Sequence, residues 1–257
     1  MSRPPVRTSV RGDVWSRLRA ATDARIGLGR SGEALPTGAM LELQYAHALA
    51  RDAVRHPLPL EAVLRALDGL PSLVVESQAG GRHAYLTRPD LGRRLALAEG
   101  ERLMPGGANL AIVLGDGLSA AAVADCGPPL VHALLARLPD WTAAPIVVAR
   151  QARVALGDEI GARLGVQAVV VLIGERPGLS AAASLGAYIT WNPAVGRLDS
   201  ERNCVSNIRA GGLSIEEAAG RIAWLVNAAR RLRLTGVGLK DAYLPDDAAR
   251  LASPPNG

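Results

Sequence analysis

Charged side chains follow several predicted strands at the points where those strands end. Asp116, Arg150 and Glu175 each lie within two residues of the end of an apolar run typical of a buried strand, and Arg153 and Arg176 follow closely. The carboxyl ends of parallel strands meet at one edge of a sheet, where α/β proteins usually bind ligands. The sequence therefore predicts a ligand-binding edge that these residues share.

A polar segment, Asn203-Cys204-Val205-Ser206-Asn207, precedes Gly211-Gly212 and is interpreted as a loop at the same edge. It adds amide, hydroxyl and thiol groups for hydrogen bonding. A thiolate nucleophile at Cys204 would need a base or a cation beside it, and no histidine is close in the sequence. A small buried side chain or a backbone contact is therefore the favoured interpretation of Cys204.

No catalytic residue is assigned to this edge. The histidines show no metal-ligand spacing, so a metal site is not expected; they are His47, His56, His83 and His132. Ser119 stands in an Asp-Gly-Leu-Ser run and not in the G-x-S-x-G of a nucleophile elbow, so helix capping is favoured. Glu175 and Arg176 form either a structural ion pair or part of a ligand site, and the residues leave both open.

Alternating strands and helices must position this edge. The central strand, 169–173, is apolar throughout, as expected for burial on both faces, and a turn with Gly174 and Pro177 ends it. This alternation predicts an α/β fold with a mostly parallel, Rossmann-like sheet, right-handed crossovers and flanking helices. Other strands are expected at 74–75, 84–86, 110–114, 145–149 and 187–190, and helices at 118–124, 130–138, 158–164 and 214–233, the last with a Ser214–Glu217 capping box.

The N-terminal part of the chain has a helical pattern. Helices are expected at 14–25, at 37–53 with Thr37 as cap, and at 60–67. We therefore divide the chain into a small helical N-terminal domain, residues 1–68, and an α/β domain, residues 69–257. Residues 27–32 match G-x-G-x-x-G, but no strand precedes them, so a flexible loop is favoured over a dinucleotide site. The polar tail after Asp241 is expected to fray.

Composition excludes several classes of protein. No apolar run approaches the roughly 20 residues of a membrane span, and the arginine- and proline-rich N-terminus has no secretory signal pattern. Two cysteines are too few for a disulfide framework and indicate a reducing cytoplasm. The net charge of +5 comes from scattered arginines without aromatic RNA-binding motifs, so neither nucleic acid nor a membrane is an expected partner.

Four runs of residues resemble a known family. They are LTRPDLGRRL (86–95), DGLS (116–119), IGERPGL (173–179) and CVSNI (204–208), the last followed by Gly211-Gly212. In this order, within a match over 25–239, they resemble the small subunit of ethanolamine ammonia-lyase. The resemblance implies a hetero-oligomer with a larger barrel subunit and adenosylcobalamin between the two subunits. It also implies an ammonia-lyase that converts ethanolamine to acetaldehyde and ammonia only in the assembled enzyme.

The resemblance carries three cofactor contacts over to this chain: Val154, Glu175 and Cys204. A carboxylate at Glu175 suits the amide groups that fringe cobalamin, and Val154 and Cys204 would add main-chain groups and apolar packing. Residues 69–257 would then form a cobalamin-binding domain. The chain departs from the family pattern at Gln151-Ala152, Ser180 and Arg209.

Alternatives to this assignment stay open. The resemblance implies a bacterial microcompartment, which family members reach through a longer N-terminal extension, so encapsulation is left open beside a cytoplasmic location. The first rival function is a stand-alone corrinoid-binding or interaction protein. The second is an unrelated α/β enzyme that uses Asp116 and Glu175 on a small polar substrate. A large-subunit reading frame beside this one would favour the lyase.

Overall fold

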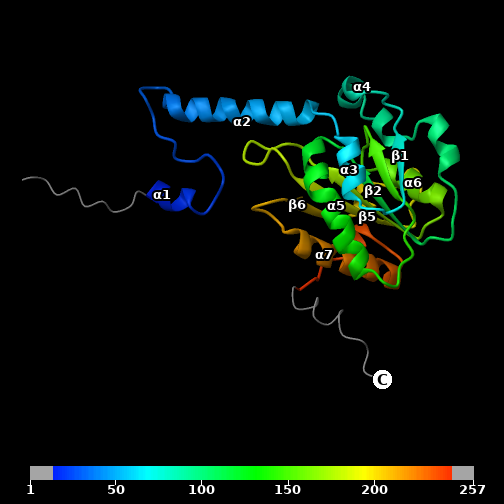
Figure 1. Cartoon of the computed structure of the whole chain (residues 1–257). Helices are drawn as coiled ribbons and strands as arrows, with labels where there is room; N and C mark the ends of the chain where they lie inside the picture. The colour runs from blue at the N-terminus through cyan, green and yellow to red at the C-terminus, as the bar shows by residue number, and fades with distance from the viewer. Residues whose placement is uncertain (1–13, 245–257) are drawn as a thin grey trace, which may run out of the picture.

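The computed structural model describes residues 14–244, and its centre is a mixed sheet of six strands in the order β1-β3-β2-β4-β5-β6 (Figure 1). The strands are β1 (Ser72–Glu76), β2 (Leu110–Gly115), β3 (Ile146–Arg150), β4 (Ala168–Gly174), β5 (Leu185–Trp191) and β6 (Asn203–Ile208). Every residue of β2 and β4 is buried, as their unbroken apolar sequences predict. The predicted α/β class and the central strand are therefore confirmed.

Four strands, β1, β3, β2 and β4, run parallel, whereas β5 is antiparallel to β4 and β6 is antiparallel to β5. The sheet is therefore mostly parallel, as predicted, but the predicted strand at 187–190 pairs in the antiparallel direction. Only residues 175–184 connect β4 to β5, which is too short for the crossover that a parallel pair needs. As a result, the carboxyl ends of β4 and β6 lie at the same edge of the sheet.

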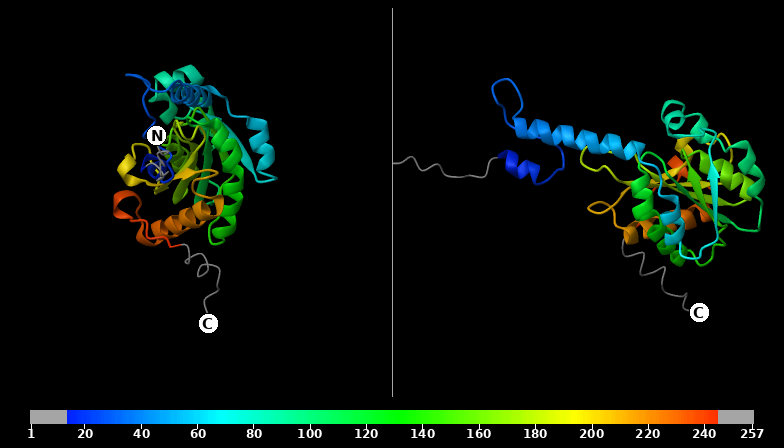
Figure 2. Two further views of the ribbon diagram at one scale, coloured as in Figure 1. Left: turned by 90° about the vertical axis from the view of Figure 1, so that its left-hand side faces the viewer. Right: turned by 45° about the horizontal axis from the view of Figure 1, so that its top comes forward.

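Helices cover the two faces of the sheet unequally (Figures 1 and 2). One face carries α3 (Leu60–Ala66), α5 (Ala120–Arg137) and α7 (Ile215–Leu232), and α5 and α7 pack on β5. The other face carries α6 (Leu156–Leu164), which packs on β2 and β4. Five short helical segments lie between or after these elements: α4 (Arg82–Thr87), η1 (Leu91–Arg93), η2 (Leu97–Arg102), η3 (Asp199–Glu201) and η4 (Gly236–Gly238).

Two glycines on α6 allow this helix to lie close to β4. A Cβ atom at Gly157 would collide with Cγ2 of Val171, and one at Gly161 would lie 2.6 Å from Cγ of Pro193. A buried ion pair holds the same helix to the start of β6, because Nη1 of Arg202 donates to both oxygens of Asp158 at 2.7 and 2.6 Å. The position of α6 is therefore fixed by close packing and by charge.

Two segments have a different structure from the one predicted. Residues 84–86 lie in α4 and not in a strand, because Tyr85 turns into the interior and its hydroxyl donates to Ala152 O at 3.1 Å. Residues 203–207 belong to β6 and not to a loop. Val205 and Ile208 are buried in the same core cluster while most of the polar residues of β6 are exposed, so the strand has one open face. The two buried residues are three positions apart because the pairing of β5 with β6 is irregular between Leu185 and Ala187.

Prolines and caps account for the remaining local differences. Pro128 and Pro129, expected to separate two helices, lie inside the single helix α5, where Gly127 and Pro128 are buried. Thr37 is the first residue of α2 (Thr37–Arg55) and not its cap, since Pro36 holds the N-cap position. The predicted capping box of α7 is confirmed by hydrogen bonds in both directions between its two residues, Ser214 and Glu217.

The N-terminal helices differ in how they pack. The helix α2 projects away from the sheet, with α1 (Val14–Arg19) near its far end (Figures 1 and 2), and Ala46 is its only buried residue. In contrast, α3 contributes Val63 and α3's C-cap Leu67 to the core beneath α5. The domain boundary at residue 68 stays a prediction.

Three further observations concern the ends of the chain and its surface. Residues 27–32 form a loop with no strand before it, and their glycines have positive φ angles. The predicted fraying after Asp241 falls mostly on residues 245–257, which lie outside the described range. No helix within residues 14–244 is long and apolar enough to cross a membrane.

Candidate functional site

The carboxyl edge of the sheet contains two separate groups of residues and not one cluster. Arg150, expected beside Asp116, instead contacts Glu76 of the neighbouring strand β1, with 2.5 Å between Nη1 and Oε1, and both side chains are exposed. Asp116 lies in one buried group at the ends of β2 and β3. Glu175 lies in another group at the ends of β4 and β6.

The first group is the Asp116 network, which consists of Arg82, Tyr85, Asp116, Gln151 and Arg153. Asp116 is 2% exposed and accepts backbone hydrogen bonds from Gln151 and Ala152 at 2.8 and 3.0 Å. Burial raises the pKa of Asp116, and these two hydrogen bonds with the nearby Arg82 oppose that shift. The carboxylate is thus fully engaged by the protein itself.

Tyr85 fills the centre of the Asp116 network. The guanidinium carbons of Arg82 and Arg153 lie 4.8 and 4.2 Å from the centre of its ring. Burial raises the pKa of Tyr85 to about 12 despite the nearby cations. The carboxylate of Asp116 and the hydroxyl of Tyr85 both bond to the backbone that follows β3, so this network holds the ends of β2 and β3 together.

The loop that follows β2 packs directly on the end of β4. The N–H of Leu118 donates to Gly174 O at 2.9 Å, and a Cβ atom at Gly117 or at Gly174 would collide with the facing backbone. Ser119 is buried at the N-cap position of α5, but its hydroxyl donates to Ala182 O at 3.3 Å and does not cap the helix. The capping interpretation of Ser119 is therefore wrong, and the DGLS run is a packing element.

The second group lies on the part of the sheet that α6 leaves uncovered. We call this surface the open half-face and define it by Val154, Glu175, Gly186, Tyr188 and Cys204. Tyr188 pairs with Val171 on β4 and with Cys204 on β6, so these three side chains share one face. Cys204 is exposed and Tyr188 is half-buried. This half-face opens toward the carboxyl edge, where Glu175 stands.

Glu175 is held in place by hydrogen bonds and not by a cation. Its Oε2 accepts a hydrogen bond from the Ser184 hydroxyl at 2.6 Å and a longer one from the N–H of Asn207 at 3.3 Å. A Cβ atom at Gly186 would lie 2.9 Å from Oε1, so glycine leaves room for the carboxylate. No ion pair joins Glu175 to Arg176 among residues 14–244. The carboxylate of Glu175 is therefore not paired with the neighbouring arginine.

Cys204 and Tyr188 are direct cross-strand neighbours on adjacent strands. Partial burial raises the pKa of the Cys204 thiol, the Tyr188 hydroxyl lowers it, and the charge of Glu175 raises it. Burial and the neighbouring Cys204 likewise raise the pKa of Tyr188. Because a raised pKa keeps the thiol protonated, Cys204 is a poor nucleophile. Cys204 is exposed, so the first of the two favoured interpretations, a small buried side chain, is wrong, and the second, a backbone contact, stays a prediction.

Val154 stands just before α6 and packs, like Tyr188, against the core between α6 and the sheet. Val154, Glu175 and Cys204 stay predicted cofactor contacts. Sequence reasoning missed Ser184 and Tyr188, which orient Glu175 and Cys204. The signal available in the sequence was the pair of apolar residues Val205 and Ile208 among the polar residues of 203–208. Within residues 14–244, no group of three or more histidine, cysteine or acidic residues could hold a metal ion.

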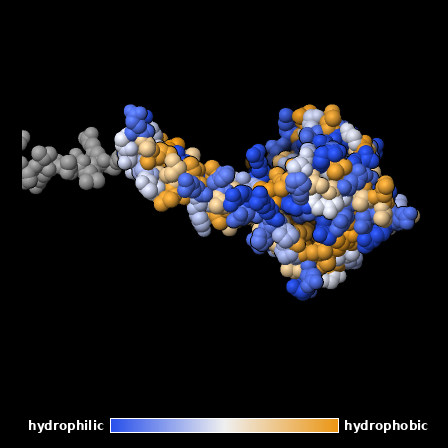
Figure 3. Space-filling view, turned by 90° about the horizontal axis from the view of Figure 1, so that it is seen from above, coloured by the Kyte–Doolittle hydropathy of each residue, from blue (hydrophilic) through white to orange (hydrophobic). Residues whose placement is uncertain are grey.

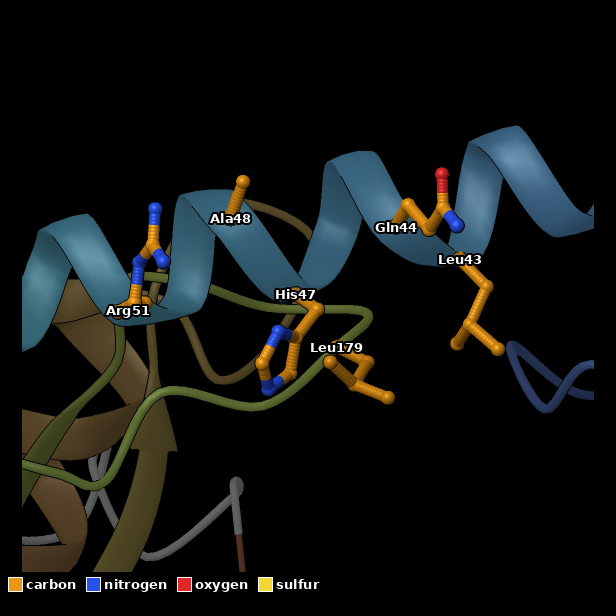
Figure 4. Close-up of a pocket in the computed structure, with 6 residues that line it drawn as sticks. All are labelled: Leu43, Gln44, His47, Ala48, Arg51 and Leu179. Carbon is orange, nitrogen blue, oxygen red and sulfur yellow. The ribbon is translucent and has the colours of Figure 1, made fainter.

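A hollow of about 440 Å³ adjoins this edge, between α2 and the loop that follows Glu175 (Figure 4). Leu179 of that loop faces α2, and Nη2 of Arg25 donates to Leu179 O at 3.1 Å. The residues that line the hollow are Leu43, Gln44, His47, Ala48, Arg51 and Leu179. The projecting N-terminal helix and the open half-face therefore meet at this loop.

Comparisons with known proteins agree over nearly the whole chain. The family model described as ethanolamine ammonia-lyase light chain (EutC) matches residues 12–240. A protein of Xanthomonas campestris pv. campestris (strain B100) is 51% identical over 259 aligned positions, which cover 95% of each chain. One of Rhodopseudomonas palustris (strain BisA53) is 52% identical, covering 93% of this chain and 95% of its own. One of Azotobacter vinelandii is 51% identical over 88% of both chains. All three are named ethanolamine ammonia-lyase small subunit.

Proposed function

Because the chain belongs to the ethanolamine ammonia-lyase light chain family, we propose that it pairs with a large subunit and completes an adenosylcobalamin site. The family is one of carbon–nitrogen lyase subunits. In the assembled enzyme, ethanolamine would be converted to acetaldehyde and ammonia. The observation that supports this proposal most is the open half-face, where Glu175, Tyr188 and Cys204 gather without a covering helix.

The residues of the open half-face fit cobalamin chemically. A corrin ring fringed with amides needs hydrogen-bond acceptors, and Glu175 offers a charged one that Ser184 already orients. The absence of a side chain at Gly186 leaves space beside that carboxylate. Cys204 and Val154 offer neutral, weakly polar surface to a bulky ligand. The cofactor would supply the radical chemistry, and this chain would bind, orient and shield it.

The same surface explains why the chain would need a partner for turnover. Glu175 is the only carboxylate on the open half-face as defined, and Cys204 has a raised pKa that disfavours its thiolate. Both oxygens of the buried Asp116 carboxylate already accept hydrogen bonds from the backbone N–H groups of Gln151 and Ala152. Binding of the amino alcohol and the proton transfers are therefore assigned to the large subunit. Location in a microcompartment stays a prediction based on the resemblance.

The test uses the complex of this chain with a large subunit of the same family. We expect deamination of ethanolamine by the complex with adenosylcobalamin and none by this chain alone. We also expect cobalamin to protect Cys204 from alkylation in the complex. Cys126, which is half-buried on α5, is an internal control whose alkylation should not change.

Three results would overturn the proposal in different ways. Turnover by the chain alone would contradict the division of labour between the subunits. Protection of Cys204 by cobalamin in the chain alone, without any affinity for a large subunit, would indicate a stand-alone corrinoid-binding protein. Alkylation of Cys204 at the same rate with and without bound cobalamin would remove the open half-face from the cofactor site.

A further inference from the structure

The N-terminal arm, residues 14–55, carries an exposed apolar ridge on α2. Leu41, Tyr45 and Leu49 are 59%, 67% and 43% exposed. Because they are spaced four residues apart, their side chains form one continuous row along the helix. We call this row the α2 ridge. Figure 3 shows apolar surface along the projecting arm, well away from the sheet.

The ridge and most of the hollow-lining residues lie on different sides of α2. At about 100° per residue, Leu43, His47 and Arg51 lie on the side of the helix away from the ridge, whereas Ala48, which also borders the hollow, lies beside Leu41. The C-terminal end of the helix is anchored to the body, because Nε of Arg82 donates to Val54 O at 2.6 Å. The ridge is therefore presented outward by a helix that is fixed at one end.

Such a helix lacks the packing that normally stabilises helices in proteins. Only Ala46 is buried among its 19 residues, and its N-terminus has no side-chain cap. In proteins, most of the stability of a helix comes from the packing of its apolar face against other elements, and α2 has little such packing. An exposed apolar row on a weakly packed helix is typical of helices that bind in a groove of a partner, with anchors at regular helical spacing.

We propose that the α2 ridge binds in a groove of the large subunit. This inference rests on the proposed function. The partner is selected by continuity: the hollow joins α2 to the loop that follows Glu175, so a protein that covers the open half-face also reaches the arm. A helix of 19 residues is about 28 Å long, which is long enough to extend the contact well beyond the cofactor site.

The experiment compares two charge-matched double variants of the full chain. Leu41→Glu with Leu49→Glu changes the ridge. Leu97→Glu with Met104→Glu changes two apolar residues that are 90% and 68% exposed and lie outside the arm. Glutamate is a good helix former, and Leu41 and Leu49 are exposed, so both variants should fold and keep their melting temperature.

Binding of each variant to the large subunit is measured by titration with the purified partner. We expect the ridge variant to bind about 100-fold more weakly, as for the loss of two interface anchors, and the control variant to bind like the original chain. Equal affinity for both variants and the original chain, or an equal loss in both variants, would overturn the assignment of the ridge.

Two further results separate this inference from its alternatives. If the original chain self-associates, and the ridge variant loses self-association but binds the large subunit normally, then the ridge is a contact between copies and the inference is wrong. If the complex forms and deaminates ethanolamine equally well with the ridge variant, only the ridge assignment fails. If the original chain has no affinity for a large subunit, the proposed function itself fails.

Discussion

The two carboxylates at the carboxyl edge of the sheet have opposite surroundings. Asp116 is 2% exposed and its two oxygens are used by backbone N–H groups. Glu175 is half-buried, is held through one oxygen, and has no cationic partner among the described residues. Where other segments cover the sheet, the oxygens of the Asp116 carboxylate are satisfied by the protein, although Nη2 of Arg82, Oε1 of Gln151 and Nε of Arg153 are buried without a hydrogen-bond partner. Where α6 leaves the sheet uncovered, the carboxylate of Glu175 is held through one oxygen only, and its other oxygen can bind a ligand.

This difference changes how the DGLS and IGERPGL runs are interpreted. Both contain a carboxylate near the end of a buried strand, and both form part of the resemblance to the family. In the structure, the first run is a packing element, because Gly117 meets the backbone of Gly174. The second run ends the open half-face. The DGLS and IGERPGL runs are therefore equally conspicuous in the sequence, but they have different roles in the structure.

The largest expected effect comes from breaking the Asp116 network. Asp116→Ala leaves the N–H groups of Gln151 and Ala152 without acceptors and removes the carboxylate 3.9 Å from Arg82. We expect the free energy of unfolding to fall by about 3–5 kcal/mol, the usual result of removing one partner of a buried charge pair. Denaturant unfolding monitored by circular dichroism measures this change.

The matched control for this variant is Glu76→Ala, which removes an exposed carboxylate that pairs with Arg150 at the same edge. Exposed ion pairs contribute at most about 1 kcal/mol, so this variant should keep nearly all of its stability. Similar losses in the two variants would contradict the distinction between a buried network and a solvated edge.

The second prediction concerns cofactor affinity. Glu175→Gln removes the charge but keeps the shape and one acceptor for the Ser184 hydroxyl. If the carboxylate accepts hydrogen bonds from cobalamin amides, the loss should be about 1.5–3 kcal/mol, or a roughly 10- to 150-fold weaker affinity. Cobalamin titration of the complex measures the affinity, and the melting temperature should stay nearly constant.

Glu76→Gln is the control for this variant, because Glu76 also ends a parallel strand but lies in β1, away from the open half-face. It should leave cobalamin affinity unchanged. A lower melting temperature of the Glu175→Gln variant with intact affinity would show that Glu175 is structural, like Asp116.

The third prediction concerns the helix that leaves the half-face open. Gly157→Ala places a methyl group against Cγ2 of Val171 and pushes α6 away from β4. Overpacking of this kind costs about 1–3 kcal/mol, and displacement of Val154 at the start of α6 should weaken cobalamin binding as well. Thermal unfolding and cobalamin titration measure the two effects.

Gly38→Ala is the control for added bulk, since a Cβ atom at that position of α2 has open space around it. Alanine is the better helix former by roughly 0.5–1 kcal/mol, so this variant should be as stable as the original chain or slightly more stable. A neutral effect of Gly157→Ala would show that α6 is not tightly fixed on β4.

Uniform patterns made part of this fold predictable from sequence. The strands β2 and β4 are unbroken apolar runs, β3 is apolar up to its last residue, Arg150, and the Ser214 capping box marks the start of α7. The strand β6 has a weaker signal, because one of its faces is open and polar. Tyr85 misled the assignment of α4, since its burial depends on Ala152, 67 residues away in the chain. Local propensity cannot report such contacts.

The candidate site was predictable only in part for the same reason. The rule for parallel strands correctly brought Asp116 and Glu175 to one edge. It could not separate them, because their surroundings depend on which helix covers which strand. Val154 and Cys204 came from the resemblance and not from any chemical pattern of their own. Tyr188 was missed because a tyrosine in a strand is ordinarily a core residue.

The smallest expected effect tests whether Glu175, Tyr188 and Cys204 share one surface. The Tyr188 hydroxyl lowers the pKa of the Cys204 thiol, and the charge of Glu175 raises it. Tyr188→Phe should therefore raise the pKa of the thiol, whereas Glu175→Gln should lower it. Because the thiolate is the reactive form, the pH profile of Cys204 alkylation should move to higher pH in the first variant and to lower pH in the second.

Opposite shifts from two substitutions are hard to produce by general loosening of the fold, which would expose the thiol and move both profiles in the same direction. Tyr45→Phe, on the exposed side of α2, is the control and should leave the profile unchanged. Loss of the Tyr188 hydroxyl should lower the free energy of unfolding by about 0.5–1.5 kcal/mol at most. Shifts of the same sign in the two variants would mean that Glu175 and Tyr188 do not act on Cys204 across a common half-face.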